Sequence, residues 1–377
     1  MSRVIALCFL LLAAVIGFLH IDSRPVWAPF TSYTAPPVEE ELEAPPAPKS
    51  KNQSAPSKAV IASPISTWLP ETGAPSVHAA SLITLNDGAH IYLWMDAKVV
   101  EHDEIIANKA AYLNPVFFWI RTLVYFATYI IFLRGFQKRS AEEDRIGGTD
   151  LHFQNYKKGA MFLVFFAVFS STSAWDWLMS IDVHWFSTLY GWYTFAGMWC
   201  STMVVLVLTT LYLKKLGYLQ KVNDSHIHDL GKWTFATSFL WSYLWFSQFM
   251  LIWYANIPEE TVYFKHRVQG SYKGIFFLNL IINFLCPLLI LMKRSAKRNY
   301  TLVAFMAVLI LFGHWIDFYQ MVMGSLSKEH VTLGWLDFGI LSLFVGLMIF
   351  FVSRALASKP LIPKSHPFLK ESIIHQV

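Results

Sequence analysis

Two ionisable residues, His314 and Asp317, lie three positions apart within the apolar stretch 301–324. This spacing places an imidazole and a carboxylate on one face of a helix. Side by side, the two groups can accept and relay protons near neutral pH. The alternative interpretation is a buried pair that only locks helix packing. Because burying an ionisable group in lipid costs several kcal/mol, both residues are candidates for function.

Two further residues are candidates for proton handling. Asp176 stands between two tryptophans, and a carboxyl flanked by indoles resists ionisation when it is unpaired. An ion pair with Arg121, or a helix cap, is the structural alternative. His184 follows Asp182 in a short polar connection and can equally be an ordinary loop residue. The predicted proton-handling groups are therefore His314, Asp317, Asp176 and His184.

The sequence contains no motif for a covalently bound cofactor or a metal. Its three cysteines, Cys8, Cys200 and Cys286, are isolated within apolar runs. There is no CxxC pair, no CxxCH haem-attachment site and no four-cysteine cluster spacing. We interpret the cysteines as apolar packing residues.

The composition indicates a membrane protein. Of 377 residues, 55% are hydrophobic and only 15% are charged, against about 25% charged residues in soluble domains. The apolar residues are concentrated in runs long enough to cross a lipid bilayer. The net charge of +5 arises from basic residues in short connections between these runs, so we expect no nucleic-acid partner. The predicted fold is an all-α polytopic membrane protein.

We predict about eight transmembrane helices. The predicted spans are 4–20, 115–134, 159–179, 190–213, 233–254, 274–292, 301–324 and 332–353. One set of connections, with the C-terminal tail, holds 18 Lys and Arg residues, whereas the opposite connections hold four. By the positive-inside rule both ends of the chain are cytoplasmic. Every Asp, Glu, Lys, Arg and His within a span then falls in the outer half of the membrane, which suggests an outward-facing polar chamber.

Five segments follow from this pattern. Residues 1–20 form an anchor, for which a cleaved signal peptide is the alternative. Residues 21–89 form a Pro-, Ala- and Ser-rich periplasmic strap, with too little apolar surface to fold alone. Residues 90–114 form an amphipathic segment on the outer membrane face. Residues 115–354 hold seven spans, and residues 355–377 form a cytoplasmic tail.

Four segments resemble one family of membrane proteins. They are DEIIANKAAYLN (103–114), WDWLMSIDVHWFSTLYGWY (175–193), SQFMLIWYANIPEET (247–261) and HWIDFYQMVM (314–323). The chain is similar to the NrfD-type membrane subunits of bacterial alternative complex III, a quinol:cytochrome c oxidoreductase. It most resembles the second large membrane subunit, which has no redox centre of its own.

The resemblance implies two four-helix bundles with flanking helices in the bacterial cytoplasmic membrane. It implies as partners a sister NrfD-type subunit, multihaem and monohaem cytochromes c and an iron–sulfur subunit. It also implies that the complex oxidises menaquinol or ubiquinol at the outer side, so that quinol or quinone is the expected ligand. Residues 21–89 hold no adequate apolar run, however. We therefore expect one complete bundle, about 190–324, and a second bundle that lacks two helices.

The sequence leaves three functions open. The first is a respiratory-complex subunit that handles protons on the quinol side and supports assembly. The second is a purely structural scaffold of the same complex. The third is an independent transporter, which the lack of polar residues in the inner halves and of paired broken spans disfavours.

Overall fold

The computed structural model describes residues 91–327 and 331–376, and these form helices without a β-strand. In the described part of the chain, six helical stretches are long and apolar enough to cross a membrane. They are α5 (Pro115–Ile146), α6 with η3 (Asp150–Ile181), α7 (Leu189–Lys215), α10 to α11 (Lys273–Ile290), α13 (Tyr300–Leu326) and α14 (Trp335–Ala357). The prediction of an all-α polytopic membrane protein is confirmed.

Two of the eight predicted spans are not among these six helical stretches. Helix α8 (Asp224–Ala255) covers the predicted span 233–254 and is 32 residues long, but it is less apolar than the six. Its place across the membrane stays a prediction. The predicted span 4–20, the strap 21–89 and the question of cleavage after the anchor lie outside the described residues.

Residue choice at the helix ends explains where the long helices begin and stop. Asn114 caps α5 by accepting from the Phe117 N–H, and Pro115 occupies the first helical turn. Gly147 ends α5 at a φ of 76°, where a side chain would be strained. Helix α8 ends at Asn256, also left-handed, and Pro258 starts α9 (Pro258–Gln269) two residues later.

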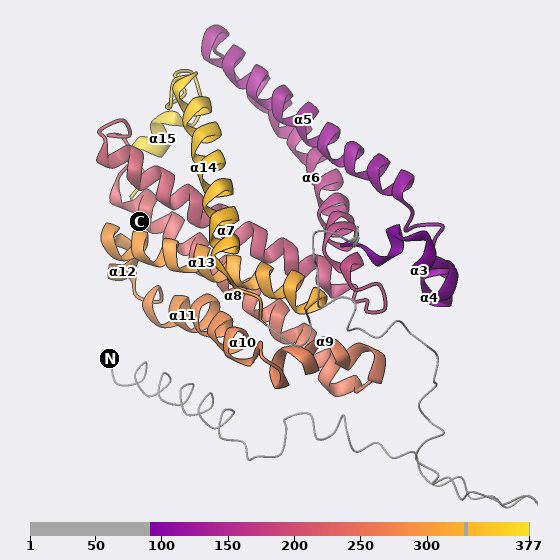
Figure 1. Cartoon of the computed structure of the whole chain (residues 1–377). Helices are drawn as coiled ribbons and strands as arrows, with labels where there is room; N and C mark the ends of the chain where they lie inside the picture. The colour runs from indigo at the N-terminus through magenta and orange to yellow at the C-terminus, as the bar shows by residue number, and fades with distance from the viewer. Residues whose placement is uncertain (1–90, 328–330, 377) are drawn as a thin grey trace, which may run out of the picture.

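One four-helix bundle is built from α7, α8, α13 and the broken helix α10–η4–α11, which contact one another (Figure 1). The broken helix consists of α10 (Lys273–Leu280), the π-helical turn η4 (Ile281–Leu285) and α11 (Cys286–Ile290). Short α12 (Arg294–Arg298) connects it to α13. Two buried apolar clusters fill the bundle, one around Trp241 and Phe276 and one around Val204 and Met306. The complete bundle predicted at about 190–324 is thus present.

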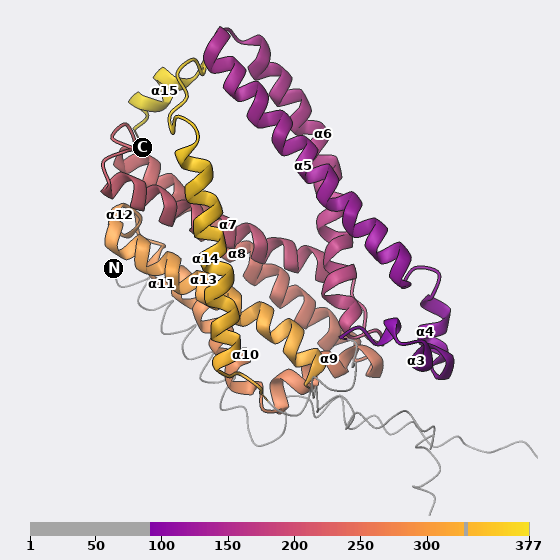
Figure 2. The ribbon, with the colours of Figure 1, turned by 45° about the horizontal axis from the view of Figure 1, so that its top comes forward.

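Helices α5 and α6 form a separate pair that contacts the bundle through α6 and α7. Both views show the pair diverging from the bundle toward the end of the molecule where the C-terminus lies (Figures 1 and 2). Close contact between α6 and α7 depends on Gly191, whose added Cβ would lie 3.1 Å from the Ser171 backbone. In the described part of the chain no further helix completes a bundle around this pair. The predicted loss of two helices concerns residues 21–89, which lie outside the described residues, and stays a prediction.

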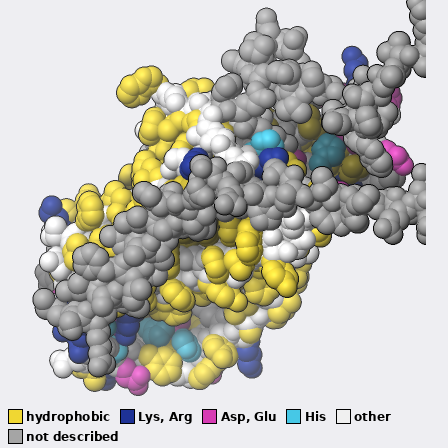
Figure 3. All heavy atoms as spheres, turned by 90° about the horizontal axis from the view of Figure 1, so that it is seen from below, with side chains coloured by type: hydrophobic (Ala, Val, Ile, Leu, Met, Phe, Trp, Pro, Cys, Tyr) yellow, Lys and Arg dark blue, Asp and Glu magenta, His cyan; other side chains and the backbone are white. Residues whose placement is uncertain are grey.

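Helix α14 has no buried residue, and its aromatic contact with the bundle joins Phe338 to Trp315 of α13 at 5.4 Å. A broad hydrophobic area also covers one face of the molecule, with the charged side chains mostly around its margin (Figure 3). Apolar side chains exposed on long helices are what a bilayer accommodates. The surface therefore agrees with the membrane assignment.

The connections assigned to one side of the membrane do lie together. The tail, with α15 (Leu369–Ile374), contacts the end of α5 through Asp144, which accepts from the Lys364 N–H at 2.8 Å. It also contacts the start of α8, where Asp229 pairs with His375 at 2.7 Å. At the opposite end, η2 (Leu93–Met95), α3 (Ala97–His102) and α4 (Glu104–Lys109) pack on the connection after α6 through Trp94, Ile106 and Val183.

Candidate functional site

Asp317 of α13 is the most enclosed carboxylate of the bundle, with 2% of its surface exposed. Trp241 Nε1 of α8 donates to Oδ2 at 3.0 Å, and Asn279 Nδ2 of α10 donates to Oδ1 at 2.7 Å. The hydroxyl of Tyr193 on α7 donates to Oδ1 as well. All four parts of the bundle thus meet at this carboxyl through neutral donors. In the described part of the chain, no Lys, Arg or His forms an ion pair with it.

The network continues along the broken helix. Asn283 Nδ2 donates to Asn279 Oδ1 at 2.5 Å, so the two amides extend the chain of hydrogen bonds away from Asp317. Asn283 lies in the π-helical turn η4, directly before a helix that contains Pro287. Proline removes a backbone donor and disturbs regular helix, and π-turns occur frequently at functional sites. The turn places both asparagines on the side that faces α13.

His314 is buried at 1% exposure, but it makes no hydrogen bond to Asp317. Both ring nitrogens lack a partner among the described residues. Its ring lies edge-on to Trp241, with centroids 5.5 Å apart, and the same indole donates to Asp317. The structure therefore brings His314 and Asp317 into one site, yet the indole of Trp241 rather than a direct bond connects them.

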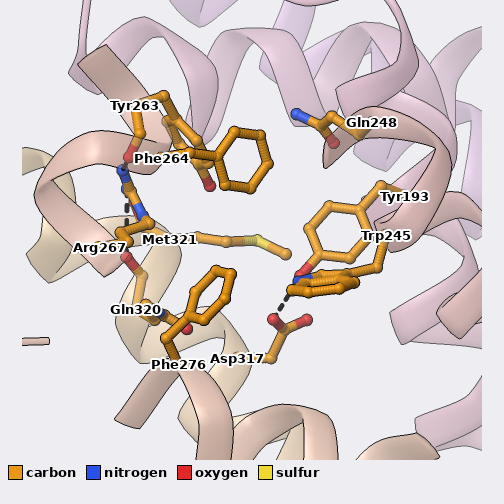
Figure 4. A pocket seen from close by; sticks show the side chains of 10 residues that line it. All are labelled: Tyr193, Trp245, Gln248, Tyr263, Phe264, Arg267, Phe276, Asp317, Gln320 and Met321. Atoms are coloured by element: carbon orange, nitrogen blue, oxygen red, sulfur yellow. Dashed lines mark hydrogen bonds between the residues drawn. The ribbon is translucent and has the colours of Figure 1, made fainter. Parts of the chain in front are cut away.

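Beside Asp317 lies a small cavity (Figure 4). Arg267 of α9 lines it and is 3% exposed. The guanidinium donates to the carbonyl oxygens of Tyr263 at 2.7 Å and of Gln320 at 3.2 Å, and it stacks on the Tyr263 ring at 3.5 Å. The remaining residues of the cavity wall come from α7, α8, α9, α10 and α13. They are Tyr193, Trp245, Gln248, Phe264, Phe276, Asp317 and Met321.

Asp176 lies elsewhere and is fully paired. Arg121 of α5 binds both carboxylate oxygens, at 2.8 and 3.0 Å, and the Tyr125 hydroxyl donates to Oδ2 at 2.9 Å. The guanidinium also stacks on the ring of Tyr112 at 4.0 Å. This is the ion pair that the sequence offered as the structural alternative. A carboxylate held by a bidentate arginine is a poor proton acceptor, because accepting a proton would break the charge-assisted bonds. A proton-handling role for Asp176 stays a prediction that this geometry does not favour.

His184 lies at the outer end of the molecule, with its side chain 49% exposed, and its Nε2 is 2.7 Å from Asp103 Oδ2. Burial raises the pKa of Asp103, but the bonds to His184 and to the N–H groups of Ile105 and Ile106 together hold that pKa below its ordinary value. Lys109 Nζ donates to the Val183 carbonyl at 2.6 Å, and burial lowers its pKa. His184 thus fastens the segment 91–114 to the connection after α6, and a role in proton transfer stays a prediction.

The four predicted residues therefore fall in three places, and only His314 and Asp317 share a site. Gln248, Asn279 and Asn283 were not among the predicted site residues, because the sequence does not show which face of each helix points toward Asp317. Sequence reasoning missed Arg267, which stood in a connection between spans. The signal was present in the amphipathic spacing of Tyr263, Phe264, Arg267 and Val268, all buried on one face of α9.

Metal-binding chemistry finds no support in the described part of the chain, where no three His, Cys, Asp or Glu residues come together. Cys200 and Cys286 are unpaired thiols in the apolar cluster around Val204, and Cys8 lies outside the described residues. Comparison with known proteins yields no assignment: no protein-family model matches the chain, and no curated protein matches it significantly.

Proposed function

We propose that this chain is an integral subunit of a respiratory quinol:cytochrome c oxidoreductase in a bacterial cytoplasmic membrane, and that Asp317 accepts protons on the quinol side. The observation that carries the proposal is the contrast between two buried carboxyls. Asp176 is bound by Arg121, whereas Asp317 is held by neutral donors from three helices. Only the second can gain a proton without breaking an ion pair.

The chemistry of quinol oxidation fits such a group. Each quinol releases two protons as it passes electrons onward, so a carboxyl near the outer face provides a site that can take one up. Trp241, Tyr193 and Asn279 orient the carboxyl, and His314 lies edge-on to the Trp241 ring. In the proposal this subunit binds no haem or cluster of its own. The cytochromes c and the iron–sulfur subunit carry the electrons, and the sister NrfD-type subunit is a further partner in the complex.

The exposed apolar surface of α14 and the separate α5–α6 pair agree with assembly into a larger membrane complex. The same surfaces agree with the alternative in which the chain is a scaffold and its buried polar network is structural. The two functions differ in whether the Asp317 carboxyl itself is needed once the complex has assembled.

The test replaces Asp317 by Asn in the intact complex and measures quinol:cytochrome c activity and proton release. If Asp317 accepts protons, activity falls by roughly 100-fold, the lower range for loss of a general base, while the c-type haem that copurifies is unchanged. The double variant Arg121→Met with Asp176→Asn is the control, because it removes a buried carboxyl that the proposal does not use and leaves no buried charge unpaired. Full activity with full haem content in Asp317→Asn would contradict proton acceptance by Asp317 and favour the scaffold function. A chain that purifies without c-type haem contradicts both.

A further inference from the structure

Three buried side chains around the cavity beside Asp317 carry N–H groups that no atom of the described residues satisfies. Gln248, Arg267 and Gln320 are 3%, 3% and 4% exposed. The atoms without a partner are Gln248 Nε2, Arg267 Nε and Gln320 Nε2. A buried donor left without a partner costs about 1–3 kcal/mol, so three around one cavity require an explanation.

The size of the cavity and the chemistry of its wall limit what can fill it. The centre of a water molecule can occupy about 10 Å³ of this cavity. This is about the volume that one ordered water needs. The unsatisfied groups are donors, and the Asp317 carboxylate in the same wall is an acceptor. A water molecule can accept from the donors and donate to the carboxylate. An anion would face the carboxylate charge at close range.

A second and larger hollow lies at the outer end of the bundle. Its volume is about 190 Å³, and it lies between the start of α7, the end of α8 and the start of α9. Phe186 and Leu251 in its wall are 57% and 63% exposed, so this groove reaches the surface. Ser187, Thr188 and Glu260 give it a polar edge. It is lined by side chains of the two connections predicted to face outward.

Gln248 is the residue that both hollows share. Its side chain separates the outer groove from the cavity beside Asp317, and one of its amide hydrogens is free to bind a water on either side. Rotation of this side chain is a motion that exposed glutamines make within nanoseconds, and burial slows it.

We propose that the cavity beside Asp317 is a binding site for a single internal water, and that the Gln248 side chain gates its exchange with the outer groove. The water accepts from the Gln248 amide and from one of the other two donors, because its oxygen has two lone pairs, and it donates to the Asp317 carboxylate. Asp317 is thereby connected to the outer side of the molecule through one ordered water and one movable amide. The water site follows from the cavity and does not depend on the quinol proposal.

X-ray radiolytic labelling of the full chain, in the membrane or complex from which it is purified, tests the water. Radicals formed from a bound water oxidise the side chains beside it, and mass spectrometry detects the added oxygen. Met321 lines the cavity and is 3% exposed, while Met306 is 0% exposed in an apolar cluster. With a water bound, Met321 is oxidised at least about tenfold faster than the equally buried Met306. Equal rates would show that the cavity is dry and overturn the proposal.

The gate is tested by mixing the protein with ¹⁸O-labelled water and varying the delay before the X-ray pulse. The delay at which ¹⁸O appears on Met321 measures exchange of the cavity water. Gln248→Ala opens the passage and shortens that delay by about fivefold or more. Gln320→Ala, which alters the cavity but not the groove, leaves the delay unchanged. If Gln248→Ala keeps the wild-type delay, Gln248 is not the gate. An unchanged Met306 rate verifies the packing in each variant.

Discussion

Replacement of Gly313 by alanine tests whether the broken helix must lie directly against α13. A Cβ at this position would lie 2.3 Å from Asn283 Oδ1 and 2.5 Å from Ile282 Cγ2. Real Cβ atoms do not approach heavy atoms so closely, so the side chains of Asn283 and Ile282 have to shift. Both neighbours belong to the π-helical turn, and Asn283 is hydrogen-bonded to Asn279, which holds Asp317.

The size of the effect follows from two contributions. Adding one methyl to a closely packed core costs about 1–3 kcal/mol, through strained rotamers and backbone shifts. Displacing Asn283 adds the loss of one buried hydrogen bond, about 1 kcal/mol. We expect Gly313→Ala to lower the free energy of unfolding by about 2–4 kcal/mol, which is a factor of roughly 30 to 900 in the equilibrium constant.

The assay is reversible unfolding in mixed micelles, with three alanine variants compared in one series. Gly346 lies in α14 and has nothing within 4 Å of its added Cβ, so Gly346→Ala reports only the change in helix propensity. Gly197→Ala is intermediate, since its Cβ meets Trp241 at an ordinary 3.5 Å. If Gly313→Ala unfolds at the same denaturant concentration as Gly346→Ala, the close approach of η4 to α13 is wrong.

Three further predictions concern ion pairs near the two ends of the molecule. Arg121→Met leaves the Asp176 carboxylate buried and unpaired, which costs about 3–5 kcal/mol in unfolding assays, and Asp176→Asn in the same chain recovers most of that loss. The pKa of Asp103 is lowered, so its bond to His184 stabilises the packing of residues 91–114 on the connection after α6. This stabilisation is present above the ordinary carboxyl pKa and is lost as the pH falls through the lowered pKa of Asp103 in the folded protein. Hydrogen exchange of residues 97–109 therefore accelerates below about pH 4, and Asp103→Asn removes this dependence. His375→Ala separates the tail from Asp229 and increases proteolytic cleavage between α14 and α15, whereas Ser358→Ala, outside that contact, does not.

The sequence predicted the long helices well because a lipid-spanning segment has a strong and local signal. Seven predicted spans between 115 and 353 each coincide with a long helix or, at 273–290, with a helix broken by a π-turn. The break itself was not predicted. Pro287 closely follows the π-turn, but a proline in a helix can produce either a kink or a π-turn. Which of the two forms depends on packing, here the close approach of α13 at Gly313.

The candidate site was harder to predict, because its chemistry depends on helix rotation and on partners distant in sequence. The spacing of His314 and Asp317 put them on one face, but a third residue, Trp241 on another helix, decides how they are connected. The chemistry of Asp176 also depends on a partner that is distant in the sequence. Its sequence surroundings left open a proton-handling carboxyl or an ion pair with Arg121, 55 positions away, and the structure forms the ion pair. An ionisable residue in a span indicates that a site exists, while the elements packed around it decide whether the group is free to react.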